Sequence, residues 1–211
     1  MAEMFKDRID AGWQLANKIK EKYPVSHAIK NGIILALPRG GVVVGAEVAK
    51  VLNMPFDIIV TRKIGAPLNP EYAVAAVSEH ELIVSPRENP DPEYLEGEVR
   101  KERQEIQRRL KEYHGPKPEI DLKNKTVILV DDGLATGLTM EVALCEVREK
   151  NPRRIILAVP VAPPETIERL KKIADETVVL NIEKMFFAVG QFYDDFSQVS
   201  DLEVKELLRD Y

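Results

Sequence analysis

This 211-residue chain has a single cysteine, Cys145, so it cannot form a disulfide bond within one copy of itself. We expect Cys145 to be a small, buried side chain of an apolar helix over residues 139–150, rather than a nucleophile or a metal ligand. The chain also lacks an apolar segment of signal-peptide length at residues 1–20, and no stretch approaches the roughly 20 apolar residues that span a bilayer. These absences predict a cytoplasmic protein with no membrane partner.

The chain also has no excess of basic residues. The formal net charge is −5, which argues against a nucleic-acid-binding groove. The three histidines, His27, His80 and His114, have no cysteine or carboxylate at the spacing of a zinc site. With no internal repeat or low-complexity tract, residues 1–211 are expected to form a single domain.

Buried strands alternate with amphipathic helices along most of the chain, and 45% of the residues are hydrophobic, enough for a sizeable core. In the first helix, Phe5, Ile9, Trp13, Ala16 and Ile19 share a helical spacing, which predicts that this face packs on a sheet. The alternation predicts an α/β fold with a doubly wound, mainly parallel sheet. The expected strands cover residues 32–37, 57–61, 126–130, 155–161 and 177–180, and the expected helices cover 3–22, 42–52, 139–150, 164–174 and 201–209.

Two segments fall outside this alternation. Residues 72–77 and 81–84 are expected to form a short hairpin, followed by a highly charged helix over about residues 91–114. The pattern favours a solvated helix that contacts the domain along one edge. A helix of a dimer interface and a moving lid are the less favoured alternatives. The C-terminal residues 183–211 are expected to form a cap or hood.

The most informative segment joins a buried strand to two carboxylates and a turn of small residues. Thr126–Val130 is an uninterrupted aliphatic and β-branched run, and Asp131 and Asp132 follow it directly, where ligands of parallel sheets gather. The turn lies at a helix N-terminus, so its backbone N–H groups are placed to bind a phosphate. The carboxylates would repel that phosphate, so they must face sugar hydroxyls or a hydrated Mg²⁺. The residues of the turn are Gly133, Leu134, Ala135, Thr136, Gly137, Leu138 and Thr139.

This segment resembles the signature of the type I phosphoribosyltransferases and is nearest to their adenine branch. The resemblance implies that Asp131 and Asp132 hold the ribose hydroxyls of phosphoribosyl pyrophosphate (PRPP), and that residues 133–139 hold its 5′-phosphate. It also implies Mg²⁺ as the cofactor, carried by the substrate and touched by the acidic pair. The alternatives are an ordinary acidic strand end or a response regulator, but the latter needs a further aspartate after a later strand.

A second anion site is expected at Pro38, Arg39, Gly40 and Gly41, where glycines allow close backbone approach and Arg39 adds a forked cation. The resemblance implies that this is the pyrophosphate loop. It also implies a pyrophosphate contact from Lys63, at the end of the next strand, and a mobile loop over residues 65–71. Arg62 is expected to face solvent.

Aromatic residues gather beyond the last expected strand, where the family builds a hood over the acceptor base. Their rings offer stacking faces for a flat heterocycle, but core filling under a C-terminal cap is the favoured interpretation for most of them. The residues assigned to the hood are Phe186, Phe187, Phe192 and Tyr193.

Together these residues predict an enzyme of nucleotide or nucleoside metabolism. It would transfer the phosphoribosyl group of PRPP to a small nitrogen acceptor and release pyrophosphate, with Arg39, Lys63, Asp131 and Asp132 as catalytic residues. The alternative is a PRPP-sensing module without turnover. A nicotinamide oxidoreductase is disfavoured because Gly40 and the glycines after it do not form the dinucleotide fingerprint. Assembly into a homo-oligomer stays open.

Overall fold

The computed structural model describes residues 4–23, 29, 31–115, 120–209 and 211. A five-stranded parallel sheet has the strand order β2-β1-β6-β7-β8, which confirms the expected α/β class. Every residue of β1 and β6 is buried, as their apolar sequences predict. In chain order the strands are β1 (Gly32–Ala36), β2 (Phe56–Ile58), β6 (Thr126–Val130), β7 (Arg154–Ala162) and β8 (Glu176–Ile182).

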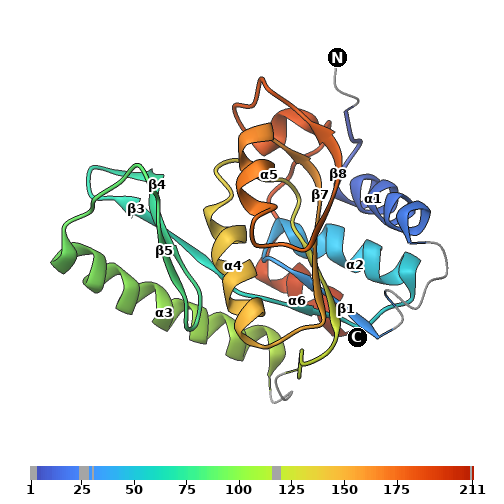
Figure 1. The fold of residues 1–211 in the computed structure, drawn as a ribbon, viewed down its shortest axis with the longest axis horizontal. Helices are drawn as coiled ribbons and strands as arrows, with labels where there is room; N and C mark the ends of the chain where they lie inside the picture. Colours follow the sequence, from blue (N-terminus) through green and yellow to red (C-terminus); the bar gives the residue numbers. More distant parts are fainter. Residues whose placement is uncertain (1–3, 24–28, 30, 116–119, 210) are drawn as a thin grey trace.

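Helices cover both faces of this sheet (Figure 1). Ile34 and Ile128 pack with α1 (Arg8–Lys22) and α2 (Gly40–Leu52), whereas their neighbours Leu35 and Leu129 belong to the core cluster on the other face. That second cluster contains α4 (Leu138–Glu149) and α5 (Pro164–Leu170). Because side chains alternate along a strand, each central strand contributes to both cores.

The buried face of α1 matches the predicted one only in part, through Ala16 and Ile19. Ile9 and Trp13 are 56% and 55% exposed, and the helix is buried instead through Ala11, Gly12, Leu15, Ala16 and Ile19. Gly12 explains the difference, because a Cβ there would lie 2.9 Å from the carbonyl oxygen of Val44 on α2. Close packing of α1 on α2 therefore selects the face with small residues. The helix also begins later than expected, after its N-cap Asp7.

A second, antiparallel sheet consists of β3 (Arg62–Ala66), β4 (Asn69–Val77) and β5 (Leu82–Val84). Together with α3 (Pro92–His114) it projects from the parallel sheet (Figure 1), and we call these four elements the arm. The hairpin of 72–77 with 81–84 and the charged helix are present as predicted. The predicted strand 57–61 is present as β2, but its predicted end is wrong, because β2 ends at Ile58 and the chain then leaves the sheet edge to pair with β4.

The C-terminal segment returns to the core. It contains the short 3-10 helix η1 (Val189–Phe192) and α6 (Asp201–Arg209), whose Val204 and Leu208 are buried. Helix α5 ends at Leu170, earlier than the predicted 174, and turns follow it. No helix within the described residues is long and apolar enough to cross a bilayer.

Candidate active site

The two predicted anion-binding motifs lie side by side because their strands are neighbours. β1 pairs with β6 in parallel, with Ala36 opposite Val130, and the N–H of Leu37 donates to the carbonyl of Val130 at 3.0 Å. The Pro38–Gly41 loop and the acidic pair therefore leave the same edge of the sheet. That edge is formed by the carboxyl ends of the strands, where α/β folds bind their ligands.

Gly40 and Gly41 lie directly against the two carboxylates. A Cβ on Gly40 would overlap Oδ2 of Asp132, and a Cβ on Gly41 would lie 2.7 Å from Oδ1 of Asp131. No other residue type fits these two positions without moving the carboxylates. The glycines thus have a role that the sequence did not reveal, since they make room for the acidic pair as well as for an anion.

Arg8, at the start of α1, holds one of the two carboxylates. Its Nε donates to Oδ2 of Asp132 at 2.7 Å, and the two side chains are only 11% and 13% exposed. The guanidinium also donates to the carbonyl of Ser197 at 2.8 Å and lies 3.8 Å from the ring centroid of Phe196. Tyr193 donates its hydroxyl to the carbonyl oxygen of Asp132 at 2.6 Å. The N-terminal helix and the C-terminal segment therefore converge on Asp132.

Burial controls the electrostatics of the acidic pair. Burial raises the pKa of Asp131 well above its usual range, and the charge of Asp132 adds to the shift. Burial also raises the pKa of Asp132, although Arg8 opposes this shift. One nearby cation for two adjacent buried carboxylates leaves a deficit of positive charge. Hydroxyl donors or a divalent cation would relieve it.

Residues 133–139 form the expected turn before a helix. Gly137 has a φ of +72°, which favours glycine, and it is the N-cap of α4. Ala135 and Thr136 are exposed at the tip of the turn, whereas the Leu134 side chain is buried in the core. The backbone N–H of Leu134 donates to the carbonyl of Val161 at 2.9 Å, so Leu134 offers no donor to an anion. Thr139, in the first turn of α4, is half-buried.

Helix α5 supports this turn from behind, a feature that was not predicted. Thr166 donates its hydroxyl to the carbonyl of Ala135 at 2.7 Å. Arg169 donates to the carbonyl of Thr136, and its Nε pairs with Glu141 of α4 at 2.8 Å. These contacts occupy the carbonyl groups of Ala135 and Thr136 on the side of the turn that faces α5. The N–H groups of the turn can therefore point toward an anion on the other side.

Arg39 and Lys63, the two predicted pyrophosphate ligands, have different surroundings. The side chain of Arg39 is 41% exposed, and its guanidinium lies 3.7 Å from Oδ1 of Asp201 on α6. Lys63 lies in β3 and pairs with the exposed Glu71 of β4 at 2.7 Å. Residues 65–71, the expected mobile loop, contain the turn of this hairpin. Lys63 begins a strand of the arm instead of ending a parallel strand.

Arg62 does not simply face solvent, so that interpretation is wrong. Its Nε donates to the buried Glu102 of α3 at 2.6 Å. This ion pair connects β3 to the charged helix. Arg62 is therefore a structural residue of the arm.

The aromatic residues assigned to the hood divide into two groups. Phe192 and Tyr193 are each 4% exposed and pack with Phe5, so they are core residues. Phe186 packs on Phe192, with ring centroids 5.0 Å apart. Phe187 is 90% exposed and is the one member of the set with a free ring face.

No group of three or more potential metal ligands occurs among the described His, Cys, Asp and Glu residues. Cys145 is half-buried on α4, and burial raises the pKa of its thiol. His27 lies outside the described residues. His80 and His114 pair with Glu146 and Asp57, respectively.

Comparison with known proteins agrees with this geometry. A family described as the phosphoribosyl transferase domain matches residues 4–197. The chain therefore belongs to the phosphoribosyltransferase family, a family of glycosyltransferase-type enzymes.

Three individual proteins show how far the similarity extends. A solved structure from Thermus thermophilus is 42% identical, with a TM-score of 0.81 and 99% of both chains covered. A Mycobacterium tuberculosis protein named as a phosphoribosyl transferase is 38% identical over 98% of this chain but only 46% of its own length. The chain thus spans about half of that relative. A uracil phosphoribosyltransferase from Aquifex aeolicus is 30% identical over 42% of this chain and 43% of its own.

Proposed function

We propose that this protein transfers the 5-phosphoribosyl group of PRPP to a nitrogen acceptor and releases pyrophosphate. The observation that carries the proposal is the contact between Gly40 and Gly41 and the carboxylates of Asp132 and Asp131. It brings an anion loop and an acidic pair together at one sheet edge, with a helix N-terminus next to them. PRPP has the matching groups: a pyrophosphate, two ring hydroxyls and a 5′-phosphate.

Each motif then has one task. The backbone N–H groups of residues 133–139 other than Leu134 bind the 5′-phosphate, and the acidic pair accepts hydrogen bonds from the ribose hydroxyls. The Pro38–Gly41 loop binds the pyrophosphate, with Arg39 leaving Asp201 to stabilise the departing charge. The ion pair of Arg39 is long and partly exposed, so this exchange costs little.

Mg²⁺ fits the acidic pair as an ion that arrives with the substrate. Among the described residues Arg8 pairs with Asp132 and no basic side chain pairs with Asp131, so these two carboxylates would hold the ion. When bound, the ion would supply charge neutralisation for the leaving pyrophosphate. The role of the chain is to position PRPP so that the bond from C1′ to the leaving oxygen can break in line with the acceptor nitrogen.

A nucleobase is the acceptor class that we propose. The Aquifex aeolicus relative is named for uracil, and the exposed ring of Phe187 offers a stacking face beyond the end of β8. In this scheme Lys63 is a second pyrophosphate contact, which requires that it release Glu71. Both residues are exposed, so breaking their ion pair costs little.

Calorimetry with PRPP and Mg²⁺, followed by a pyrophosphate-release assay with a panel of purines and pyrimidines, tests the proposal. The double variant Asp131→Asn with Asp132→Asn should lose PRPP binding, whereas Asp121→Asn, at an exposed position, should retain it. Absence of PRPP binding to the folded wild type would refute the proposal. Binding without pyrophosphate release for any acceptor would favour the PRPP-sensing alternative.

A further inference from the structure

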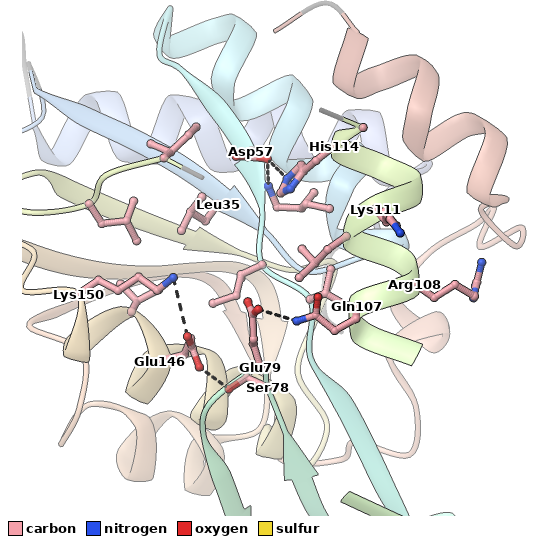
Figure 2. Close-up of a pocket in the computed structure, with 18 of the residues that line it drawn as sticks. Leu35, Asp57, Ser78, Glu79, Gln107, Arg108, Lys111, His114, Glu146 and Lys150 are labelled. Carbon is pink, nitrogen blue, oxygen red and sulfur yellow. Dashed lines mark hydrogen bonds and ion pairs between the residues drawn. The ribbon is translucent and has the colours of Figure 1, made fainter. Parts of the chain in front are cut away.

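A large cavity lies away from the acidic pair, between α3, the β2 edge of the sheet and the C-terminal half of α4 (Figure 2). Its volume is about 660 Å³, within the range of small-molecule sites. None of its lining residues belongs to 38–41 or 131–139. It is lined by Glu146 and Val147 near the end of α4, whereas the phosphate turn precedes the start of that helix. The cavity is thus separate from the proposed PRPP site.

The floor of the cavity is apolar. Ile59, which follows β2, and Ile120 line it with half-buried side chains, and the core residues Leu35, Ile58 and Val147 lie behind them. Leu110 contributes a further apolar side chain from α3. A hydrophobic ligand body would therefore contact a surface that is already formed.

Two of the carboxylates in the wall are satisfied by protein partners. His114 Nε2 lies 2.5 Å from Oδ1 of Asp57. Glu146 accepts from the hydroxyl of Ser78 at 2.7 Å and lies 3.8 Å from the amine of Lys150. Figure 2 shows both groups of contacts along the wall. These groups need no ligand.

Glu79 is different. Its side chain extends from the turn between β4 and β5 into the space between α3 and α4, where Gln107 Nε2 donates to Oε1 at 2.5 Å (Figure 2). No lysine or arginine among the described residues forms an ion pair with it, and the neighbouring His80 turns to Glu146 instead. Arg108 points to the far side of α3, where Glu105 and Glu112 engage it. Gln107 is exposed and Glu79 is half-buried, so the carboxylate lies at the mouth of the cavity, where its remaining lone pairs can accept hydrogen bonds from a cation.

We propose that this cavity is a second ligand site, and that it binds a small organic amine with a flat or branched apolar body. The ammonium group donates to Glu79 and to the side-chain oxygen of Gln107, while the body lies on Ile59, Leu110 and Ile120. The lining balances three carboxylates (Asp57, Glu79 and Glu146) with three cations (Arg108, Lys111 and Lys150), so the preference for a cation over an anion comes from Glu79 alone. This inference does not depend on the proposed transferase activity.

Three probes that share an indole ring test the proposal by calorimetry on the full chain: tryptamine, 3-methylindole and indole-3-acetate. Tryptamine should bind about tenfold more tightly than neutral 3-methylindole, the effect of one hydrogen bond to a charged group. Indole-3-acetate should bind most weakly. Saturable tryptamine binding should persist with pyrophosphate and ribose 5-phosphate present, whereas competition by them would overturn the assignment.

The variant Glu79→Gln should remove the preference for tryptamine over 3-methylindole, and the matched control Glu93→Gln, at an exposed position of α3, should keep it. Leu110→Trp, which fills the cavity from a half-buried position, should weaken binding of all three probes. If this variant does not fold, Glu79→Gln still decides the matter. Equal affinities for the three probes, no saturable binding, or an unchanged preference in Glu79→Gln would each overturn the proposal.

Discussion

The parallel sheet and the arm are held together by different forces. β1 and β6 bury every residue, whereas α3 buries only three of its 23 residues, Glu102, Ile106 and Tyr113. Much of the surface of α3 instead carries ion pairs, such as that of Arg108 with Glu105 at 2.7 Å. Apolar burial stabilises strongly and is insensitive to salt, but exposed ion pairs contribute little and are screened. The candidate site follows the most rigid strands, as preorganised binding requires.

Truncation of a core residue in each region tests this difference most strongly. Ile128→Ala in β6 should lower the free energy of unfolding by about 2–5 kcal/mol, because a fully buried side chain leaves a cavity. Leu95→Ala, at a half-buried position of α3, should cost about 1 kcal/mol. Urea denaturation measures both values. Equal losses would mean that the arm is packed as tightly as the sheet.

Gly40→Ala should weaken PRPP binding about 100-fold, or by roughly 2.8 kcal/mol. The added Cβ would overlap Oδ2 of Asp132 and displace the carboxylate from Arg8. The matched control is Gly97→Ala in α3, where a Cβ meets nothing within 4 Å. There the change should leave binding unaffected and stabilise the fold by about 0.5–1 kcal/mol. Calorimetry that shows normal affinity in Gly40→Ala would contradict the close-contact argument.

Arg8→Gln should reduce PRPP affinity about tenfold, the usual effect of removing one charged hydrogen bond. Without the guanidinium the pKa of Asp132 rises further, since Arg8 opposes the effect of burial. The loss of affinity on acidification should therefore begin at a higher pH in the variant than in the wild type. Lys6→Gln, which alters an exposed residue near the start of the same helix, is the control. Identical pH profiles for Arg8→Gln and wild type would show that Arg8 does not tune Asp132.

The smallest effect is expected in the arm, where His80 joins the β4–β5 turn to α4. The hydrogen bond to Glu146 raises the pKa of His80. The His80–Glu146 pair therefore stabilises the fold fully below about pH 6.5, and this stabilisation disappears as the pH rises through the raised pKa. Because His80 is largely exposed, His80→Gln should cost less than about 0.5 kcal/mol near pH 6 and nothing near pH 9. Thermal unfolding at the two pH values measures the difference. A larger cost near pH 9 than near pH 6 would contradict the inference that protonated His80 stabilises the fold through Glu146.

Local patterns predicted the parallel sheet and the acidic pair, but they failed where the chain departs from the sheet. The prediction for 57–61 counted apolar residues that continue past Ile58, although Arg62 already pairs with Val77 of β4. Ile9 and Trp13 were likewise assigned to the buried face by hydrophobicity, whereas close packing at Gly12 buries Ala11 and Leu15 in their place. In both cases a contact with a distant segment overrides a local preference.

The amino-acid sequence by itself determined the strand that ends in Asp131 and Asp132, the turn that follows it, and the glycine loop after β1. Those features depend on residues next to one another in the chain. Only the tertiary structure decided that Arg8, 124 positions away, holds Asp132, and that Glu79 meets Gln107 in a cavity. Side chains so far apart in sequence meet through the packing of whole elements, and no local pattern contains that information.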